Sequence, residues 1–181
     1  MRIVSKTIVI DANTARSAGD RNATSPLAIA CRDILDVIYK ICHKVVASDD
    51  ILAEWDEHGS NYFRKWRTWM KSRGKLMYIG QCRDKNLRDY IRNSLSRGIV
   101  WEAVEKDVPY IEAALSPLAN KVVISRDPSA RDRFCEVCGA IKIIRKIIWL
   151  NPEIAGEEII TWLRKGAKYE VHRTLGFDNR S

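Results

Sequence analysis

The sequence predicts an α/β fold in which a mainly parallel sheet of about five strands lies between two layers of helices, a three-layer α/β/α sandwich. Short apolar runs rich in Val and Ile alternate along the chain with longer segments of helical periodicity. The apolar runs are continuous, as expected for strands that are covered on both faces of the sheet. Strands separated by helices are usually joined by right-handed crossovers, which make neighbouring strands parallel.

Five segments are predicted to be strands because each is short, apolar and rich in β-branched residues. In chain order they are Thr7–Ile10, Lys44–Ala47, Leu76–Ile79, Lys121–Ser125 and Ile147–Leu150. The length of 181 residues favours one domain. We expect this domain to cover residues 1–164, with a basic helical insertion at residues 60–99, and to be followed by a loosely held basic C-terminal tail at residues 165–181.

Six segments have the apolar spacing or the end signals of helices. They are Ala28–Lys44, Asp50–Glu57, Asn61–Ser72, Lys85–Leu95, Pro109–Leu115 and Glu153–Arg164. Ser48 and Asp49 supply N-cap chemistry before the second segment, and Asp107 precedes the fifth. Residues 16–21 are predicted to form a polar loop.

The chain is basic, with 31 Lys and Arg against 23 Asp and Glu and a formal net charge of +8. This surplus favours an anionic partner, most simply a nucleic acid. Apolar runs fall short of the ~18 residues that span a bilayer, and the N-terminus lacks a secretory signal, so we expect a cytoplasmic protein with no membrane partner. An odd number of cysteines favours a reducing compartment, and the isolated pair Cys135 and Cys138 favours buried or incidental thiols over a zinc site.

Acidic residues stand near the carboxyl ends of predicted strands, where ligands bind in open parallel sheets. Asp11 follows the first strand, Asp127 follows the fourth, and Glu54 comes shortly after the second. Asp107 opens the helix that leads into the fourth strand. Clustered carboxylates repel one another unless a cation neutralises them, and hard oxygen ligands favour Mg²⁺ or Mn²⁺. The pattern therefore predicts a metal site suited to hydrolysing a phosphodiester.

Most of these acids also have a structural interpretation that the sequence leaves open. Asp107 can cap a helix, and Asp127 can shape the turn before the proline that follows it. Glu54 can be one exposed charge among several on its helix, whereas Asp11 serves no turn that the sequence reveals. The prediction of a metal site therefore depends on the joint pattern of the four acids.

Five motifs, taken in order, resemble those of the PIN domain family. They are Val9–Asn13, Ser48–Glu54, Lys106–Leu115, Val122–Asp127 and Ile147–Pro152. The first is a hydrophobic strand that ends in Asp-x-Asn, and the fourth is a strand that ends in Ser-x-Asp. The resemblance extends from about residue 7 to residue 164. The chain departs from the family pattern where residues 128–131 separate Asp127 from Asp132.

The resemblance implies a Mg²⁺- or Mn²⁺-dependent endonuclease that cleaves RNA more often than DNA. It implies that Asp11, Glu54, Asp107 and Asp127 are the catalytic, metal-binding residues, and that Asn13 lies beside the first ligand and orients a water molecule or the substrate. Many family members dimerise or are toxins of toxin–antitoxin pairs, so the resemblance adds a homodimer and an antitoxin protein to the expected partners.

Residues 60–75 carry six basic residues and no acid. Arg64, Arg67, Lys71 and Lys75 are spaced by three, four and four residues, which places them on one stripe if the segment is a helix. We expect this stripe to contact RNA phosphates. The aromatic residues of the segment are expected to pack the helix onto the body, with an exposed ring that stacks on a base as the alternative.

Two other functions stay open on the sequence alone. The first is a non-catalytic PIN-like module that acts as a scaffold or an RNA-binding subunit. The second is a different α/β fold with an acidic pocket, such as a phosphotransfer receiver or a haloacid-dehalogenase-like phosphatase. It fits less well, because such a phosphatase begins with Asp-x-Asp, whereas this chain has Asp11-Ala12-Asn13.

Overall fold

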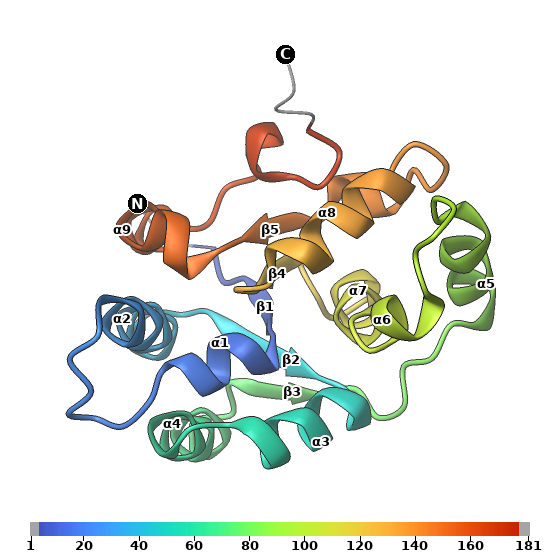
Figure 1. The fold of residues 1–181 in the computed structure, drawn as a ribbon. Coiled ribbons are helices and arrows are strands. Elements are labelled where there is room, and N and C mark those ends of the chain that lie inside the picture. Colours follow the sequence, from blue (N-terminus) through green and yellow to red (C-terminus); the bar gives the residue numbers. More distant parts are fainter. Residues whose placement is uncertain (1–3, 178–181) are drawn as a thin grey trace.

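The computed structural model of the protein describes residues 4–177 and has the predicted three-layer architecture (Figure 1). Five parallel strands form one sheet in the order β3-β2-β1-β4-β5. The strands are β1 (Thr7–Ile10), β2 (Lys44–Ala47), β3 (Leu76–Tyr78), β4 (Val122–Ile124) and β5 (Ile148–Leu150). All five predicted strands are confirmed, and their ends differ from the prediction by no more than one residue.

The helices include the six that the sequence predicts and three more. They are α1 (Ala12–Ser17), α2 (Pro26–Lys40), α3 (Asp49–His58), α4 (Asn61–Ser72), α5 (Lys85–Ser94), α6 (Trp101–Glu105), α7 (Val108–Leu115), α8 (Pro128–Val137) and α9 (Pro152–Arg164). The unpredicted ones are α1, α6 and α8, and α1 takes up the first two residues of the predicted polar loop. The prediction of Ala28–Lys44 for α2 was wrong at both ends. The helix begins two residues earlier, because Ser25 caps it by accepting from the Ala28 N–H, and it ends at Lys40, four residues before β2 begins.

The helices cover both faces of the sheet (Figure 1). On one face α2 packs against both α4 and α9, and Gly156 of α9 approaches Ala30 of α2 so closely that an added Cβ would lie 3.1 Å from the Ala30 Cβ. On the other face α7 packs against β1, β2 and β4. Helices α1, α3 and α8 begin directly after β1, β2 and β4, so their first turns gather at the carboxyl edge of the sheet.

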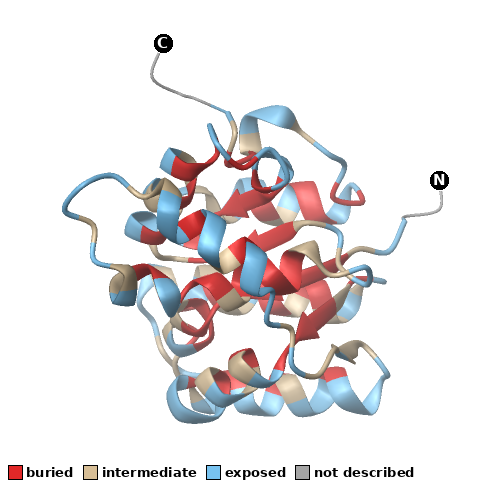
Figure 2. Ribbon diagram, turned by 90° about the vertical axis from the view of Figure 1, so that its right-hand side faces the viewer, coloured by how far each residue is buried: buried red, intermediate tan, exposed pale blue. Residues whose placement is uncertain are grey.

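Strands β1, β4 and β5 are fully buried at the centre of the molecule, and β2 is buried except at its first residue (Figure 2). The edge strand β3 is partly exposed. Large rings from the helices extend this core, among them the fully buried Trp55, Phe63 and Trp66. The Trp55 Nε1–H donates to the Ile10 carbonyl at 3.0 Å, and the Trp66 Nε1–H donates to the Leu35 carbonyl at 2.7 Å. The buried polar edges of both indoles are therefore satisfied. The first of these bonds also fixes α3 against the end of β1.

The segments predicted as an insertion and a tail both contact the sheet. Residues 60–99 contain α4, α5 and the edge strand β3, which pairs with β2. Of the predicted tail, Thr174 forms an isolated antiparallel bridge with Ile148, and Leu175 is buried. Residues 178–181 of the tail lie outside the described residues.

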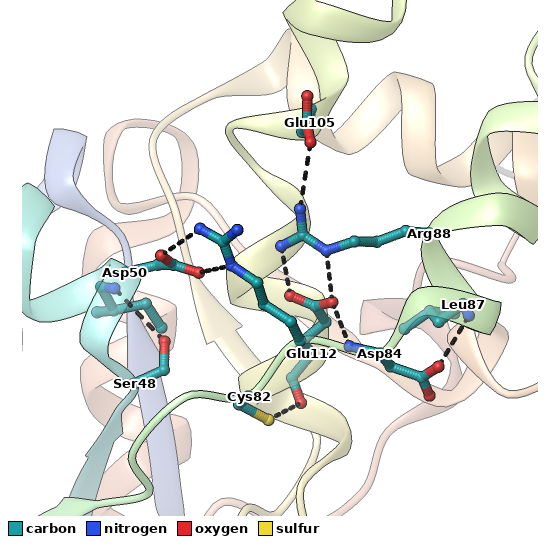
Figure 3. Close-up of polar contacts among 10 residues, drawn as sticks. Ser48, Asp50, Cys82, Asp84, Leu87, Arg88, Glu105 and Glu112 are labelled. Carbon is teal, nitrogen blue, oxygen red and sulfur yellow. Dashed lines mark hydrogen bonds and ion pairs between the residues drawn. The ribbon is translucent and has the colours of Figure 1, made fainter.

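An ion pair between Arg88 and Glu112 anchors α5 to α7 (Figure 3). The buried Glu112 carboxylate accepts from Nε and Nη2 of Arg88, both at 2.8 Å, and from the Asp84 backbone N–H at 2.8 Å. Glu105 lies 3.4 Å from Nη1 of the same guanidinium. The bond to Glu112 is the main cause that raises the pKa of Arg88 above its ordinary value. Sequence analysis did not identify this pair.

Arg88→Met is expected to lower the free energy of unfolding by about 3–5 kcal/mol, because it leaves the Glu112 charge buried and uncompensated. Arg88→Met combined with Glu112→Met should recover most of this loss, because it removes both charges. Arg83→Met is the control. Arg83 pairs with Asp50 at 2.9 Å at an exposed position, so the free energy of unfolding should hardly change. Urea unfolding followed by circular dichroism measures all four proteins, and a double variant as unstable as Arg88→Met would contradict the account.

Candidate functional site

The neighbouring strands β1 and β4 bring Asp11 and Asp127 to the same edge of the sheet. The Asp11 N–H donates to the Ile124 carbonyl at 3.0 Å, so the ladder between the two strands continues beyond β1. Ser125 links the two acids, because its Oγ donates to Asp11 Oδ2 at 2.5 Å and accepts from the Asp127 N–H at 3.1 Å. Sequence analysis did not name Ser125 as a site residue, although it is the serine of the Ser-x-Asp motif.

Asp11 and Asp127 also cap the helices that follow them. Asp11 Oδ1 accepts from the Thr14 N–H at 2.6 Å at the start of α1, and Asp127 Oδ1 accepts from the Ala130 N–H at 3.0 Å at the start of α8. Asp127 therefore has a structural role, but it caps a helix instead of shaping the turn that the sequence suggested. Asp11 has a capping role that the sequence did not reveal, because α1 was not predicted. A carboxylate oxygen has more than one lone pair, so capping leaves both residues able to bind a cation.

Asp107 differs from these two acids because it caps nothing. It stands at the N-cap position of α7 without a side-chain capping bond, so the capping interpretation of Asp107 was wrong. Its Oδ2 is buried and has no hydrogen-bond partner. Arg133 Nη1 of α8 lies 3.8 Å from that oxygen, too far for a hydrogen bond.

The surroundings of Asp107 shift its ionisation strongly. The pKa of Asp107 is raised to about 7, mainly by burial. The charges of Asp127 and Asp11 contribute to this increase, and the charges of Lys106 and Arg133 oppose it. Burial also raises the pKa of Asp11 above its ordinary value, and the hydrogen bonds from Ser125 and Thr14 oppose this change. These carboxylates are therefore close enough for their charges to interact.

Tyr110 contributes a hydroxyl that sequence analysis did not predict. It lies three residues after Asp107 in α7, and its Oη accepts from the Ala12 N–H at 3.1 Å. Burial, followed by the charge of Asp11, raises the pKa of Tyr110, with smaller contributions from Glu54 and Asp107. The phenol is therefore neutral at neutral pH and its O–H can donate to an oxygen atom in the site.

The remaining predicted site residues lie at the margin of this group. Glu54 of α3 is half-exposed, and its Oε2 lies 3.6 Å from His58 Nε2 one helical turn later. Its charge reaches Tyr110, so it lies within electrostatic range of the site. Asn13 is half-buried in the first turn of α1.

The donor chemistry of the site suits a hard divalent cation, but its coordination shell is not preformed. A buried carboxylate oxygen without a hydrogen bond, within electrostatic range of two further carboxylates, is the type of oxygen ligand that Mg²⁺ and Mn²⁺ prefer. Within residues 4–177, however, no three His, Cys, Asp or Glu side chains are grouped so that they could hold a metal ion. Binding a cation would therefore require the side chains to move.

The four basic residues of the predicted stripe make different contacts in the structure. Lys75 lies beyond the end of the helix, where its Nζ donates to three backbone carbonyls at the end of α2. Arg64 donates to two backbone carbonyls at and just before the end of α3, and Arg67 pairs with Asp56 at 2.6 Å. Lys71 is exposed. The four residues therefore do not form one solvent-facing row.

Two cavities of the described residues lie away from the acids. One of about 900 Å³ is lined mainly by α9 and the segment that follows it. Another, of about 630 Å³, is lined in part by Cys135 and Cys138. Burial raises the pKa of the Cys138 thiol to about 12, so this group is neutral and unreactive at neutral pH.

No family model, curated protein or solved structure matches the chain. The class of the protein is therefore defined by its own structure, an α/β/α sandwich with a five-stranded parallel sheet whose carboxyl edge carries buried acids. Across residues 4–177, the helices are all too short or too polar to cross a lipid bilayer.

Asp107→Asn is expected to stabilise the protein at alkaline pH. The folded-state pKa of about 7 exceeds the ordinary value of 3.8, so between these two values the folded state binds the additional proton. The free energy of unfolding of the wild type should therefore fall as the pH rises through this window. The variant should be more stable than the wild type by on the order of 4 kcal/mol at pH 8 and similar to it at pH 3.

Urea unfolding of the two proteins in EDTA at pH 3, 6 and 8 measures this difference. Asp132→Asn is the control, because Asp132 is exposed on α8 and should show little pH-dependent difference from the wild type. A stability difference between wild type and Asp107→Asn that is the same at pH 3 and pH 8 would contradict the raised pKa.

Proposed function

We propose that the protein is a Mg²⁺- or Mn²⁺-dependent ribonuclease with a PIN-like site. The observation that carries this proposal is Asp107, a buried carboxylate with an unbonded oxygen beside Asp11 and Asp127. Such an arrangement lowers the stability of the folded protein, and strongly perturbed acids of this kind are typical of functional sites. A divalent cation would remove the repulsion, and the basic chain around the site suits a polyanionic substrate.

In this proposal Asp11, Asp107 and Asp127 hold the cation. Glu54, at the margin of this group, is the fourth ligand. The ion would supply Lewis-acid activation of water and neutralise charge on the scissile phosphate. Asp11 and Asp127 are fixed by their capping bonds and by Ser125. Since no hydrogen bond holds Oδ2 of Asp107, this side chain can turn towards a cation at low cost.

The neutral side chains of the site would position the substrate. The Tyr110 O–H is available to donate to an oxygen of the phosphate or of the attacking water, because its Oη already accepts from the Ala12 N–H. Asn13, in the first turn of α1, is proposed to orient the same groups. RNA as the substrate, a homodimer, an antitoxin protein and a cytoplasmic location stay predictions.

A non-catalytic RNA-binding or scaffold module is the second candidate. The observation that favours it is the absence, within residues 4–177, of three grouped side chains that could hold a metal ion. Metal binding separates the two candidates, because a scaffold has no need of it.

Asp11→Asn is expected to slow the cleavage of single-stranded RNA in Mn²⁺ by about 100-fold or more, because it removes a charge that holds the ion. Asparagine still accepts the capping bond from the Thr14 N–H, so the melting temperature should change little. Asp84→Asn is a matched control, because Asp84 caps α5 by accepting from the Leu87 N–H at 3.0 Å and is not one of the clustered acids. A fluorophore–quencher RNA reports cleavage, and full activity of Asp11→Asn would refute the assignment.

Mn²⁺ is expected to raise the melting temperature of the wild type, and to do so more at pH 8 than at pH 5.5. Asp107 must lose its proton to bind the ion, so protonation at the lower pH competes with binding. Asp107→Asn should lose most of the shift at pH 8. Thermal denaturation at increasing Mn²⁺ concentration tests this, and a wild type that shows no shift at either pH would favour the scaffold.

A further inference from the structure

Helix α4 carries an exposed ring cluster that the cleavage site does not use. All six tryptophans of the chain lie within the described residues, and Trp69 is the most exposed of them, at 41%. Its ring centroid lies 5.9 Å from that of Tyr39 and 6.4 Å from that of Tyr62. Tyr62 is itself fixed by a hydrogen bond to Asp36 of α2. The Trp69 ring is therefore held in place by its neighbours while part of it stays open to solvent.

Cationic side chains lie next to the ring cluster. The Arg73 guanidinium lies 4.6 Å from the centroid of the Tyr39 ring, and Lys65 is exposed one helical turn before Trp69. No acid occurs between Glu57 and Asp84 in the sequence. Asp36 contacts the cluster, because it bonds to Tyr62, and it pairs with Lys40 at 3.6 Å. Asp33 also lies within electrostatic range of Tyr62. The surface around Trp69 is therefore aromatic and mainly positive.

We infer that Trp69 is a stacking platform for an unpaired base of single-stranded RNA, with Lys65 and Arg73 contacting the adjacent phosphates. Aromatic rings next to basic side chains bind single strands in this way, because each base has a face that can stack and a charged backbone beside it. A base inside a duplex is already stacked and cannot reach the ring. The inference rests on the proposed function only for the identity of the strand as RNA.

The platform lies on a different flank of α4 from the stripe that sequence analysis selected. Lys65 and Trp69 are four residues apart and share one side of the helix, whereas Arg64, Arg67 and Lys71 share another. Both arginines of that stripe already bond to α3. The side chains that border Trp69 are therefore better placed to bind a phosphate backbone.

The platform is also displaced from the acids along α4. The start of α4 lies beside α1, because the Ser60 Oγ donates to the Ala15 carbonyl at 2.8 Å and the Tyr62 N–H donates to the Gly19 carbonyl at 3.1 Å. Trp69 is eight residues beyond Asn61, about 12 Å further by helical rise. A strand must therefore extend over several nucleotides to engage both places, and a very short substrate would gain nothing from Trp69.

The first test is binding in EDTA, where metal-dependent cleavage cannot occur, of a fluorescein-labelled RNA 12-mer followed by anisotropy. Trp69→Ala is expected to weaken binding by about five- to a hundred-fold, and Trp69→Phe to restore most of it, whereas Trp69→Leu should not. Lys65→Ala with Arg73→Ala should reduce the slope of log K against log salt by about 0.7 for each lost phosphate contact. Tyr90→Ala, at an exposed ring on α5, is the matched control and should bind as the wild type does.

Equal affinity of wild type and Trp69→Ala for the 12-mer, with both proteins folded by circular dichroism, would overturn the inference, as would tighter binding of a duplex of the same sequence. A 12-mer without bases should bind both proteins equally. A DNA 12-mer bound through Trp69 as tightly as RNA would support the platform and contradict the RNA preference of the proposed function.

Cleavage provides a second readout in Mn²⁺. Trp69→Ala should lower kcat/KM for the 12-mer and leave that for a trinucleotide unchanged, because the short strand does not reach the platform. Equal losses on both substrates would overturn the inference. If the wild type does not cleave RNA, the proposed function is refuted but the stacking platform is not. The binding experiment in EDTA tests the platform independently of cleavage.

Discussion

The parallel pairing of β1 with β4 forces the acids that follow these strands into one place, because the carboxyl ends of parallel neighbours meet at the same edge. In this chain the acids are Asp11 and Asp127, and Ser125 bonds to both. Helix α7 adds Asp107 to the group, and burial raises its pKa to about 7. The strand order therefore places three acids so that ionising Asp107 destabilises the folded protein. Replacing any one of the three acids should weaken this effect.

Helix N-termini stabilise two of these three charges. Asp11 and Asp127 lie at the N-termini of α1 and α8, where free N–H groups and the helix dipole favour an anion. Asp107 receives no such bond. Glu112, whose side chain is 1% exposed against 10% for Asp107, accepts two hydrogen bonds from Arg88. At Asp107 the only ion-pair partner among the described residues is the more distant Arg133, 3.8 Å away, so the carboxylate is less fully compensated than that of Glu112. We propose that a cation supplies the remaining compensation.

Sequence patterns predicted most of the fold because strands that are covered on both faces consist of consecutive apolar residues, which are easy to recognise in a sequence. They failed for α1 and α8 for one shared reason: each helix is capped by an acid, Asp11 or Asp127, that the same patterns assigned to a ligand site or a turn. The predicted basic stripe included Lys75 on the condition that all of residues 60–75 are helical. The helix ends at Ser72, as its predicted bounds had it, and Gly74 follows in the left-handed conformation, with φ of +63°, that glycine adopts easily. Ser125 and Tyr110 are residue types that occur throughout proteins, so their presence in the sequence does not mark them as site residues. Only the folded structure shows that their hydroxyl groups lie at the site.

The account depends most directly on the ionisation of Asp107, which ¹³C NMR of the side-chain carboxyl can follow as the pH is varied. Without divalent ions we expect a pKa near 7, against the ordinary value of 3.8, and with saturating Mg²⁺ we expect it to fall well below 7 as the cation stabilises the charged form. A pKa close to 3.8 in the absence of Mg²⁺, or a raised value that Mg²⁺ leaves unchanged, would contradict a cation site at this edge of the sheet.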